Sequence, residues 1–391
     1  MRLNYVSWAD YTGYAVAAKS YLRAFHRAGM AVTWSPMLPD EKGYRSVENF
    51  SSEDPVLAEL AQRNGDCDTV VIHTVPEYYP PLIENARAAG RRVFGYTVWE
   101  LENLPAHWPA ILNRLDGVVV PCRWNVEVFR NSGVSVPIHV VPHLSQFASL
   151  GDADGAEHDP AGPKSCGKAF APGRFMFYTI GFWSNRKAPD LVVRAFLRAF
   201  EASDPVSLVI KTSRNDITRW HRHWRNGFRL RHPSPKETLR GLVRPFKAAP
   251  LIAVIPDETL PDDQMLALHR RGDCFVSLAR AEGWGLGAFD AALMGNPVVM
   301  TGYGGQRDFL DPTHASLVDY RMVPVHEPTW AASYRASDQW AEPDLDHAIA
   351  LMREVYENRV EASHKARLLA VDLRSRFSEQ AILEAWRRAL S

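Results

Sequence analysis

The feature that most constrains this fold is a repeated alternation of short apolar runs with amphipathic stretches. The runs are rich in β-branched and aromatic residues, and they are apolar throughout rather than at every second residue. Strands of this kind are buried on both faces, and helices between them indicate a parallel sheet covered on both sides. Residues 14–29 read as one such helix, which ends on glycine as a helix C-terminus commonly does. We expect strands at residues 2–8, 31–37, 68–74, 91–99, 116–122 and 138–143, and again at 174–181, 206–213, 251–257, 274–279 and 297–301.

The alternation stops once and then restarts, which divides the chain into two parts. Residues 151–173 are rich in Gly, Pro, Asp and Ala and have little periodicity, which is typical of a linker or loop. We therefore expect two doubly wound, Rossmann-like α/β domains at residues 1–165 and 172–375, followed by a C-terminal helix at residues 376–391. In such an arrangement the cleft between the domains is the default ligand site.

The composition argues against several other classes of protein. The chain has 391 residues, and its 45 Lys and Arg balance its 45 Asp and Glu, which argues against nucleic-acid binding. The four cysteines form no CxxC pair, so we expect a reducing compartment without disulfides or zinc. The Asp-x-Asp patterns at residues 66–68 and 152–154 read as loop acids, and we expect no metal. The chain starts without the apolar core of a signal peptide and has no run long enough to span a membrane, so we expect a cytoplasmic protein.

One stretch of the second half combines two carboxylates with glycine-rich loops. Glu282 lies among Gly283, Gly285 and Gly287, and Asp290 follows in the first turns of a short helix. A loop that leads from a parallel strand into a helix N-terminus is where such folds bind anions, and glycines let backbone N–H groups approach the ligand. A carboxylate in that helix can accept two hydroxyl hydrogen bonds, as a ribose diol requires. The alternative is a helix-entry loop whose acid compensates the helix dipole.

This stretch resembles the signature of the family 4 retaining glycosyltransferases, which have the GT-B fold. That signature is an acid, seven residues and a second acid, written EGFGLPxxEAMAxGxPVV. Glu282 and Asp290 fall on the two acid positions, and Gly295, Pro297 and Val298 also match. The second acid of the family is normally Glu, so the shorter Asp290 is a departure from the pattern.

Other segments of the second half resemble the family elements that hold the donor diphosphate. The run TGYGGQRDFL resembles a loop whose glycine amides, here those of Gly304 and Gly305, lie near the donor phosphates and sugar. Lys187 matches the family lysine, whereas Phe182 stands in place of the family arginine and Arg186 is the candidate to replace it. The residues that the resemblance assigns to donor binding are Asp290, Arg186, Gly13, Gly283, Gly285, Leu286, Gly287, Gly304 and Gly305.

The first half resembles the family more diffusely. Gly13 matches the first glycine loop of the family, and Trp99 and Glu100 stand where the family often has a histidine. Glu100 is therefore a candidate catalytic residue, with a helix-entry acid as the alternative. The acceptor-side candidates are His73, Tyr11 and Trp99. His73 is alternatively a satisfied strand-end histidine, and the aromatic rings either stack on a sugar or fill a core.

The resemblance implies a reaction and a set of partners. A nucleotide-diphosphate sugar would bind mainly to the second domain, and a glycan or lipid-linked acceptor would enter from the first. A hexosyl group would be transferred with retention and without a metal or cofactor, as in polysaccharide biosynthesis, and the C-terminal helix would cross back to the first domain. Glu282, Lys187 and Glu100 are the implied catalytic residues, because positive potential must stabilise the departing diphosphate.

Three alternatives stay open from the sequence. Residues 211–247 are strongly basic with interleaved aromatics. They read either as a solvated insertion or as a contact with an anionic bilayer or lipid diphosphate, which would place the protein at the inner membrane face. A nucleotide-sugar epimerase would share the fold, but it needs acid and base residues around the sugar that we do not find in the sequence. A non-catalytic nucleotide- or sugar-binding regulator is the third alternative, and it would bind nucleotide without turnover.

Overall fold

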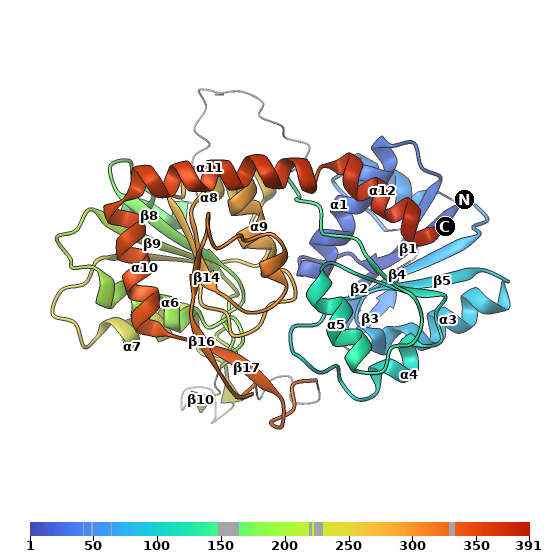
Figure 1. Cartoon of the computed structure of the whole chain (residues 1–391), viewed down its shortest axis with the longest axis horizontal. Helices are drawn as coiled ribbons and strands as arrows, with labels where there is room; N and C mark the ends of the chain where they lie inside the picture. The colour runs from blue at the N-terminus through green and yellow to red at the C-terminus, as the bar shows by residue number, and fades with distance from the viewer. Residues whose placement is uncertain are drawn as a thin grey trace. The chain divides into compact units, whose positions relative to one another are not determined.

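The structure is a computed structural model of the chain, in which two compact units can be distinguished (Figure 1). One unit is formed by Met1–Gly151 with Ser375–Ser391, and the other by Asp152–Arg374. Each is an α/β unit around a mainly parallel sheet, which confirms the expected fold class. The described residues are 1–41, 43–47, 50–63, 65–147, 164–218, 221–222, 230–327 and 333–391.

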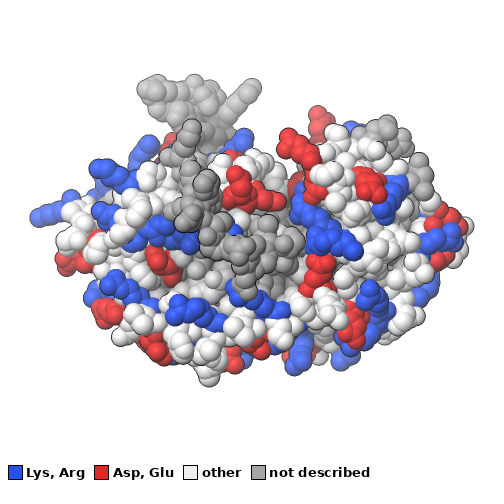
Figure 2. Space-filling view, turned by 90° about the horizontal axis from the view of Figure 1, so that it is seen from above, with Lys and Arg blue, Asp and Glu red and all other residues white. Residues whose placement is uncertain are grey.

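Parts of two segments singled out in the sequence lie outside the described residues. They are residues 151–163 of the expected linker, and residues 219–220 and 223–229 of the basic stretch, which include Trp220, Trp224 and Phe228. Within the described ranges no helix is long and apolar enough to cross a bilayer. On the face drawn in Figure 2, basic and acidic side chains are intermixed.

The first unit is built on a seven-stranded sheet. Its strands are β1 (Leu3–Trp8), β2 (Val32–Asp40), β3 (Gly43–Ser46), β4 (Thr69–His73), β5 (Arg92–Tyr96), β6 (Gly117–Val120) and β7 (Ile138–Val140). Their order is β3-β2-β1-β4-β5-β6-β7, and all neighbours are parallel except β2 and β3. Strands form at all six places expected here. The sequence did not predict β3, because its four residues, GYRS, form no apolar run.

The helices of this unit begin and end at residues suited to those positions. The hydroxyl of Thr12 accepts a hydrogen bond from the backbone N–H of Ala15 at the start of α1, and Gly29 adopts a positive φ of 65° just past its end. Asp54 caps the second helix in the same way, through the N–H groups of Val56 and Leu57. The helices are α1 (Gly13–Arg27), α2 (Pro55–Gln62), η1 (Pro76–Tyr78), α3 (Tyr79–Ala88), α4 (Trp108–Leu112), α5 (Arg123–Asn131) and α12 (Glu379–Leu390).

The C-terminal helix α12 packs back onto the first unit through one tryptophan. Trp386 is fully buried, and its ring lies 5.3 Å from that of Tyr21, 5.6 Å from those of Phe25 and Tyr96, and 6.0 Å from that of Tyr5, measured between centroids. Burial of several aromatic rings against one another is among the largest stabilising contributions in a core. The last helix is therefore part of the core of the first unit.

Two histidines complete this aromatic cluster and are held neutral. The hydroxyl of Tyr5 hydrogen bonds Nδ1 of His73 at 2.7 Å, and the hydroxyl of Tyr96 lies 3.2 Å from Nδ1 of His143. Burial lowers the pKa of His143 to about 3 and the pKa of His73 well below its ordinary value. His73 is thus a buried, hydrogen-bonded histidine at the end of β4, which is one of the two alternatives that the sequence left open.

The second unit is built on a six-stranded parallel sheet. Its strands are β8 (Phe175–Ile180), β9 (Val206–Thr212), β12 (Leu251–Pro256), β13 (Cys274–Ser277), β14 (Val298–Thr301) and β15 (Ser316–Val318). The order β12-β9-β8-β13-β14-β15 is that of a doubly wound fold, with the strand order reversing between β8 and β13. Strands form at the five places expected in this half, and the short β15 is an addition.

Helices and two small antiparallel ribbons surround this sheet. The pair β16 (Tyr320–Pro324) and β17 (Gln339–Pro343) forms a hairpin, and β10 (His221–Arg222) pairs with β11 (Leu230–Arg231). The sequence predicted none of these ribbons, because their strands form no continuous apolar run in the sequence. The helices are η3 (Lys164–Phe170), α6 (Pro189–Ala199), α7 (Pro235–Val243), α8 (Asp262–Arg271), α9 (Leu286–Leu293), η5 (Gly305–Asp308), α10 (Leu345–Glu357) and α11 (Arg359–Arg376).

We expect Trp386→Ala to destabilise the protein by about 3–5 kcal/mol, because it removes the ring at the centre of the aromatic cluster. Urea denaturation followed by circular dichroism measures this loss. The control is Val360→Ala on α11, where the side chain is 79% exposed. That change should stay within about 0.5 kcal/mol of the wild type. Equal stability of the two variants would contradict the role given to Trp386.

Candidate functional site

Three loops meet at the carboxyl edge of the second sheet. They follow β8, β13 and β14, and the first two flank the point at which the strand order reverses. In open α/β sheets this switch point is where ligands bind. The loops bring together Lys187, Glu282 and the glycine pair Gly304–Gly305, which are far apart in the sequence.

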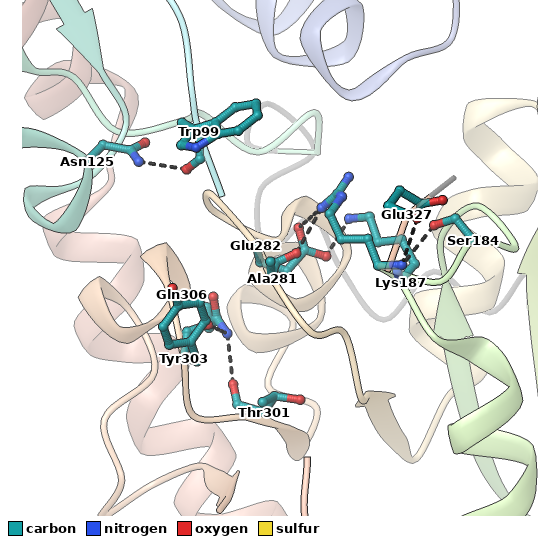
Figure 3. Close-up of polar contacts among 11 residues, drawn as sticks. Trp99, Asn125, Ser184, Lys187, Ala281, Glu282, Thr301, Tyr303, Gln306 and Glu327 are labelled. Atoms are coloured by element: carbon teal, nitrogen blue, oxygen red, sulfur yellow. Dashed lines mark hydrogen bonds and ion pairs between the residues drawn. The ribbon is translucent and has the colours of Figure 1, made fainter. Parts of the chain in front are cut away.

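Glu282 is the charged centre of this edge. Its side chain is only 8% exposed, and its Oε1 forms an ion pair with Nζ of Lys187 (Figure 3). Its Oε2 lies 3.6 Å from Nη1 of Arg186, which also donates to the carbonyl of Ala281 at 2.9 Å. A carboxylate this deeply buried requires such partners, because an unpaired buried charge is strongly unfavourable.

The loop after β8 carries Lys187 and has a strained backbone at the next residue, Ala188. Ala188 has a φ of 45°, and it is the one residue other than glycine with positive φ among the described ranges. Pro189, the first residue of α6, disfavours the ordinary helical conformation for the residue before it. The backbone N–H of Lys187 donates to Oγ of Ser184 at 3.2 Å, which fixes the turn. Strain of this kind is kept where the surrounding structure over-determines it, often at functional sites.

The glycine loop after β14 touches the backbone of Glu282 directly. The N–H of Gly305 donates to the carbonyl of Glu282 at 2.9 Å, and Gly304 has a φ of 104°. A Cβ added at Gly304 would collide with that same carbonyl oxygen. Only glycine therefore allows the two loops to approach this closely.

A buried glutamine that the sequence did not single out closes this loop. Gln306 is fully buried, and its side-chain amide donates to the carbonyls of Thr301, at 2.8 Å, and of Tyr303 (Figure 3). These bonds join the end of β14 to the start of η5, with Gly304 and Gly305 between them. No sequence pattern pointed to Gln306, because its partners are backbone carbonyls.

The helix α9 carries the second acid of the signature. Gly285, with a φ of 92°, is its N-cap, and Leu286 is its first residue. A Cβ added at Gly287 would lie 3.2 Å from the ring of Phe275, so the first turn of the helix sits tightly on the sheet. Asp290 is buried within this helix, one turn from its start. Gly283 is buried in the same loop.

Arg280 joins two of these loops, and the sequence did not single it out either. Its backbone N–H donates to the carbonyl of Arg186 at 2.8 Å, and its side-chain Nη1 donates to the carbonyl of Asn185. Its guanidinium forms a bidentate ion pair with Glu342 of β17. A bidentate pair fixes an arginine in both position and orientation. The loops after β8 and β13 are therefore linked by one side chain.

The residues expected on the acceptor side lie in the first unit and differ in exposure. Tyr11 is 49% exposed, while Trp99 is buried, with its Nε1–H donated to the carbonyl of Asn103 at 2.7 Å. His73 is buried in the aromatic cluster, as described above. Glu100 is partly exposed, and its charge adds to burial in raising the pKa of Tyr14. Gly13 is exposed and is the first residue of α1.

No cluster of metal-ligating side chains occurs within the described ranges. The chemistry of the site is instead that of cations and backbone amides around one carboxylate. Such a set binds phosphate oxygens, since arginine, lysine and amide N–H groups all donate hydrogen bonds to them.

Comparison with known proteins finds similarity at the level of structure. No protein-family model matches the chain, and no curated protein sequence matches it. Sucrose-phosphate synthase from Thermosynechococcus elongatus gives a TM-score of 0.65 at 12% identity, over 99% of this chain and 97% of that one. Anabaena HepE in complex with UDP-glucose gives a TM-score of 0.64 at 10% identity, over 100% of this chain and 99% of HepE. The G117R variant of S. aureus TarM gives a TM-score of 0.54 at 13% identity, over 82% of this chain and 55% of TarM. The chain therefore spans about half the length of that protein.

This chain has the GT-B fold. The similarity to the first two proteins covers nearly the full length of both chains, and each unit has the doubly wound sheet that the fold requires. The GT-B fold expected from the signature is confirmed. At identities of 10% to 13% the likeness concerns the fold, so the activity has to be argued from the site.

We expect Gly304→Ala to destabilise the protein by about 1–3 kcal/mol, because the added Cβ meets the carbonyl of Glu282 in a backbone region that disfavours other residues. Urea denaturation measures the effect. Gly241→Ala in α7 is the control, since nothing lies within 4 Å of the Cβ added there. It should be neutral or up to about 1 kcal/mol stabilising. A Gly304→Ala variant as stable as Gly241→Ala would show that the two loops are not in close contact.

Proposed function

We propose that the protein is a retaining glycosyltransferase of family 4, which moves a hexosyl group from a nucleotide-diphosphate sugar to a glycan or glycolipid acceptor without a metal. The observation that carries the proposal is the meeting of Lys187, Arg186 and the glycine amides with Glu282 at the switch point of the second sheet. The donor complexes of HepE support the choice of a uridine nucleotide as the first donor to test.

The diphosphate of the donor would be held by these cations and amides. Lys187 is a compact charge on a flexible stem, whereas Arg186 offers a planar fork to two phosphate oxygens. The N–H of Gly304 and the start of α9 add positive potential without a counter-charge of their own. Without the donor, Glu282 forms an ion pair with each of the two cations. A donor diphosphate would therefore compete with Glu282 for the same partners.

In the reaction the bond between the sugar C1 and the diphosphate oxygen breaks, and its electron pair goes to the departing diphosphate. The acceptor hydroxyl forms its bond to C1 on the same face, and its proton goes to the leaving phosphate oxygen. Lys187 and Arg186 stabilise the negative charge that develops on that oxygen. This positive potential is used most in the transition state, as catalysis requires.

Glu282 has a second task once the diphosphate has engaged its cations. Its carboxylate can then accept hydrogen bonds from sugar hydroxyls and stabilise the positive charge that develops at C1. Its backbone is fixed by the N–H of Gly305, so the carboxylate stays close to the diphosphate site. Asp290 is proposed to hold the ribose hydroxyls from α9. In the first unit, Glu100 and the exposed Tyr11 are the proposed acceptor-side residues.

Transfer is tested with a panel of nucleotide-diphosphate sugars and of glycan and lipid-linked acceptors, by NMR of the sugar and by release of nucleoside diphosphate. We expect product only with both substrates present, with the anomeric configuration of the donor kept. Conversion of the donor without an acceptor would indicate an epimerase. Tight nucleotide binding without turnover across the panel would indicate a regulator.

We expect Glu282→Gln to lower the transfer rate by at least about 100-fold, the effect typical of losing a group that stabilises transition-state charge. Calorimetry should show nucleoside diphosphate binding that is unchanged or tighter, because the cations lose their internal competitor. Glu361→Gln is the matched control, since Glu361 also pairs with a lysine, Lys365, at 3.7 Å but is exposed. It should leave both measurements unchanged. Transfer by Glu282→Gln within about twofold of the wild type would remove Glu282 from the mechanism.

A further inference from the structure

The hairpin β16–β17 reaches the loops that carry the cations of the second unit. It is inserted between the last strand of the sheet, β15, and the helix α10. Its strands pair antiparallel from Tyr320 opposite Pro343 to Pro324 opposite Gln339. Beyond its own pairing, the N–H of Ala341 donates to the carbonyl of Arg280 at 3.0 Å. The hairpin is thus hydrogen bonded to the segment that leads into Glu282.

The first side-chain contact of the hairpin is the ion pair between Glu342 and Arg280. One arm of the pair joins Nη2 of Arg280 to Oε1 of Glu342 at 3.1 Å, and the other joins Nε to Oε2. The guanidinium also lies 5.4 Å from the ring centroid of the buried Trp340. The side chain of Arg280 in turn donates through Nη1 to the carbonyl of Asn185, and its backbone N–H donates to the carbonyl of Arg186. Glu342 therefore acts on the loop after β8 through one arginine.

The second contact is a buried carboxylate just past β16. Glu327 is 2% exposed, and its Oε2 accepts a hydrogen bond from the backbone N–H of Arg186 at 3.1 Å. Figure 3 shows Glu327 beside Ser184 and Lys187. Both backbone polar groups of Arg186 are consequently hydrogen bonded, its N–H to Glu327 and its carbonyl to the backbone N–H of Arg280.

The burial of these groups distinguishes them from ordinary surface ion pairs. The side chains of Arg280 and Glu342 are 14% and 26% exposed, whereas those of the surface pair Arg198–Asp346 are 51% and 81% exposed. Screening by water makes an exposed pair contribute little, and a bidentate, partly buried pair contributes more and fixes geometry. A hairpin with no role at the site would not need two carboxylates directed at the same loop.

We propose that the β16–β17 hairpin is a brace that positions Arg186 and Lys187 for the donor diphosphate, with Glu342 and Glu327 as its positioning residues. This inference rests on the proposed function, since it assigns the braced cations to a diphosphate. A phosphate-binding loop gains from such a brace because cations held in place need no reorganisation when charge develops. Glu342 acts through Arg280, and Glu327 acts through the backbone of Arg186.

Calorimetric titration of the full chain with inorganic pyrophosphate tests the brace without requiring the sugar or acceptor. We expect Glu342→Gln to weaken pyrophosphate binding about tenfold. Its melting temperature should stay close to that of the wild type. The matched control Asp346→Asn, which breaks the exposed pair with Arg198, should bind pyrophosphate as the wild type does. In the transfer assay Glu342→Gln should lower kcat more than it raises KM for the donor, because the cations act most strongly in the transition state.

Two different substitutions at Glu327 give an independent test of the brace. Glu327→Gln keeps an oxygen that can accept from the N–H of Arg186 and should retain most of the pyrophosphate affinity. Glu327→Leu removes that acceptor and should bind pyrophosphate more weakly than Glu327→Gln. This pair decides the question if Glu342→Gln does not fold.

The outcomes separate the brace from the proposed function. If the wild type binds pyrophosphate and transfers sugar but Glu342→Gln and Glu327→Leu do so equally well, the brace is overturned and the proposed function stands. Affinity that falls only in step with melting temperature also overturns the brace, because the hairpin would then be merely structural. If the wild type neither binds pyrophosphate nor transfers sugar, the proposed function fails, and the brace fails with it.

Discussion

The site depends on one buried carboxylate that is shared by two cations. Glu282 is buried and forms ion pairs with both Lys187 and Arg186, which is the arrangement that a buried charge requires. These cations are also the groups that a diphosphate would bind. The carboxylate therefore keeps the cations together and desolvated before a ligand arrives, and a diphosphate would replace one anion by another.

Backbone contacts hold the three charges in place. Glu282 is fixed through its carbonyl by Gly305, and Arg186 is fixed through its carbonyl by Arg280. Because these bonds join loops after different strands, the arrangement follows from the parallel sheet, which brings the carboxyl ends of β8, β13 and β14 to one edge. Fixed groups stabilise a developing charge better than mobile ones, since they do not have to reorganise.

The sequence predicted the parts that follow from local pattern. The sheets were predictable because their strands are continuous apolar runs. Glu282 and Lys187 were proposed from their signature positions, and the structure brings the two side chains together. Arg280 could not be found, because its partners are carbonyls and a carboxylate that lie far away in the chain. The hairpin was missed because β16 is largely exposed and has no apolar run. The sequence left His73 open between core and cleft, because its burial depends on aromatic rings far away in the chain, among them those of Tyr5 and Tyr21.

The most direct test of the account is the crystal structure of the full chain with a nucleoside diphosphate bound. We expect the diphosphate between Nζ of Lys187, the guanidinium of Arg186 and the backbone amides of Gly304 and the start of α9, with the ion pair between Lys187 and Glu282 broken. A diphosphate bound at any other place, with that ion pair intact, would contradict the account.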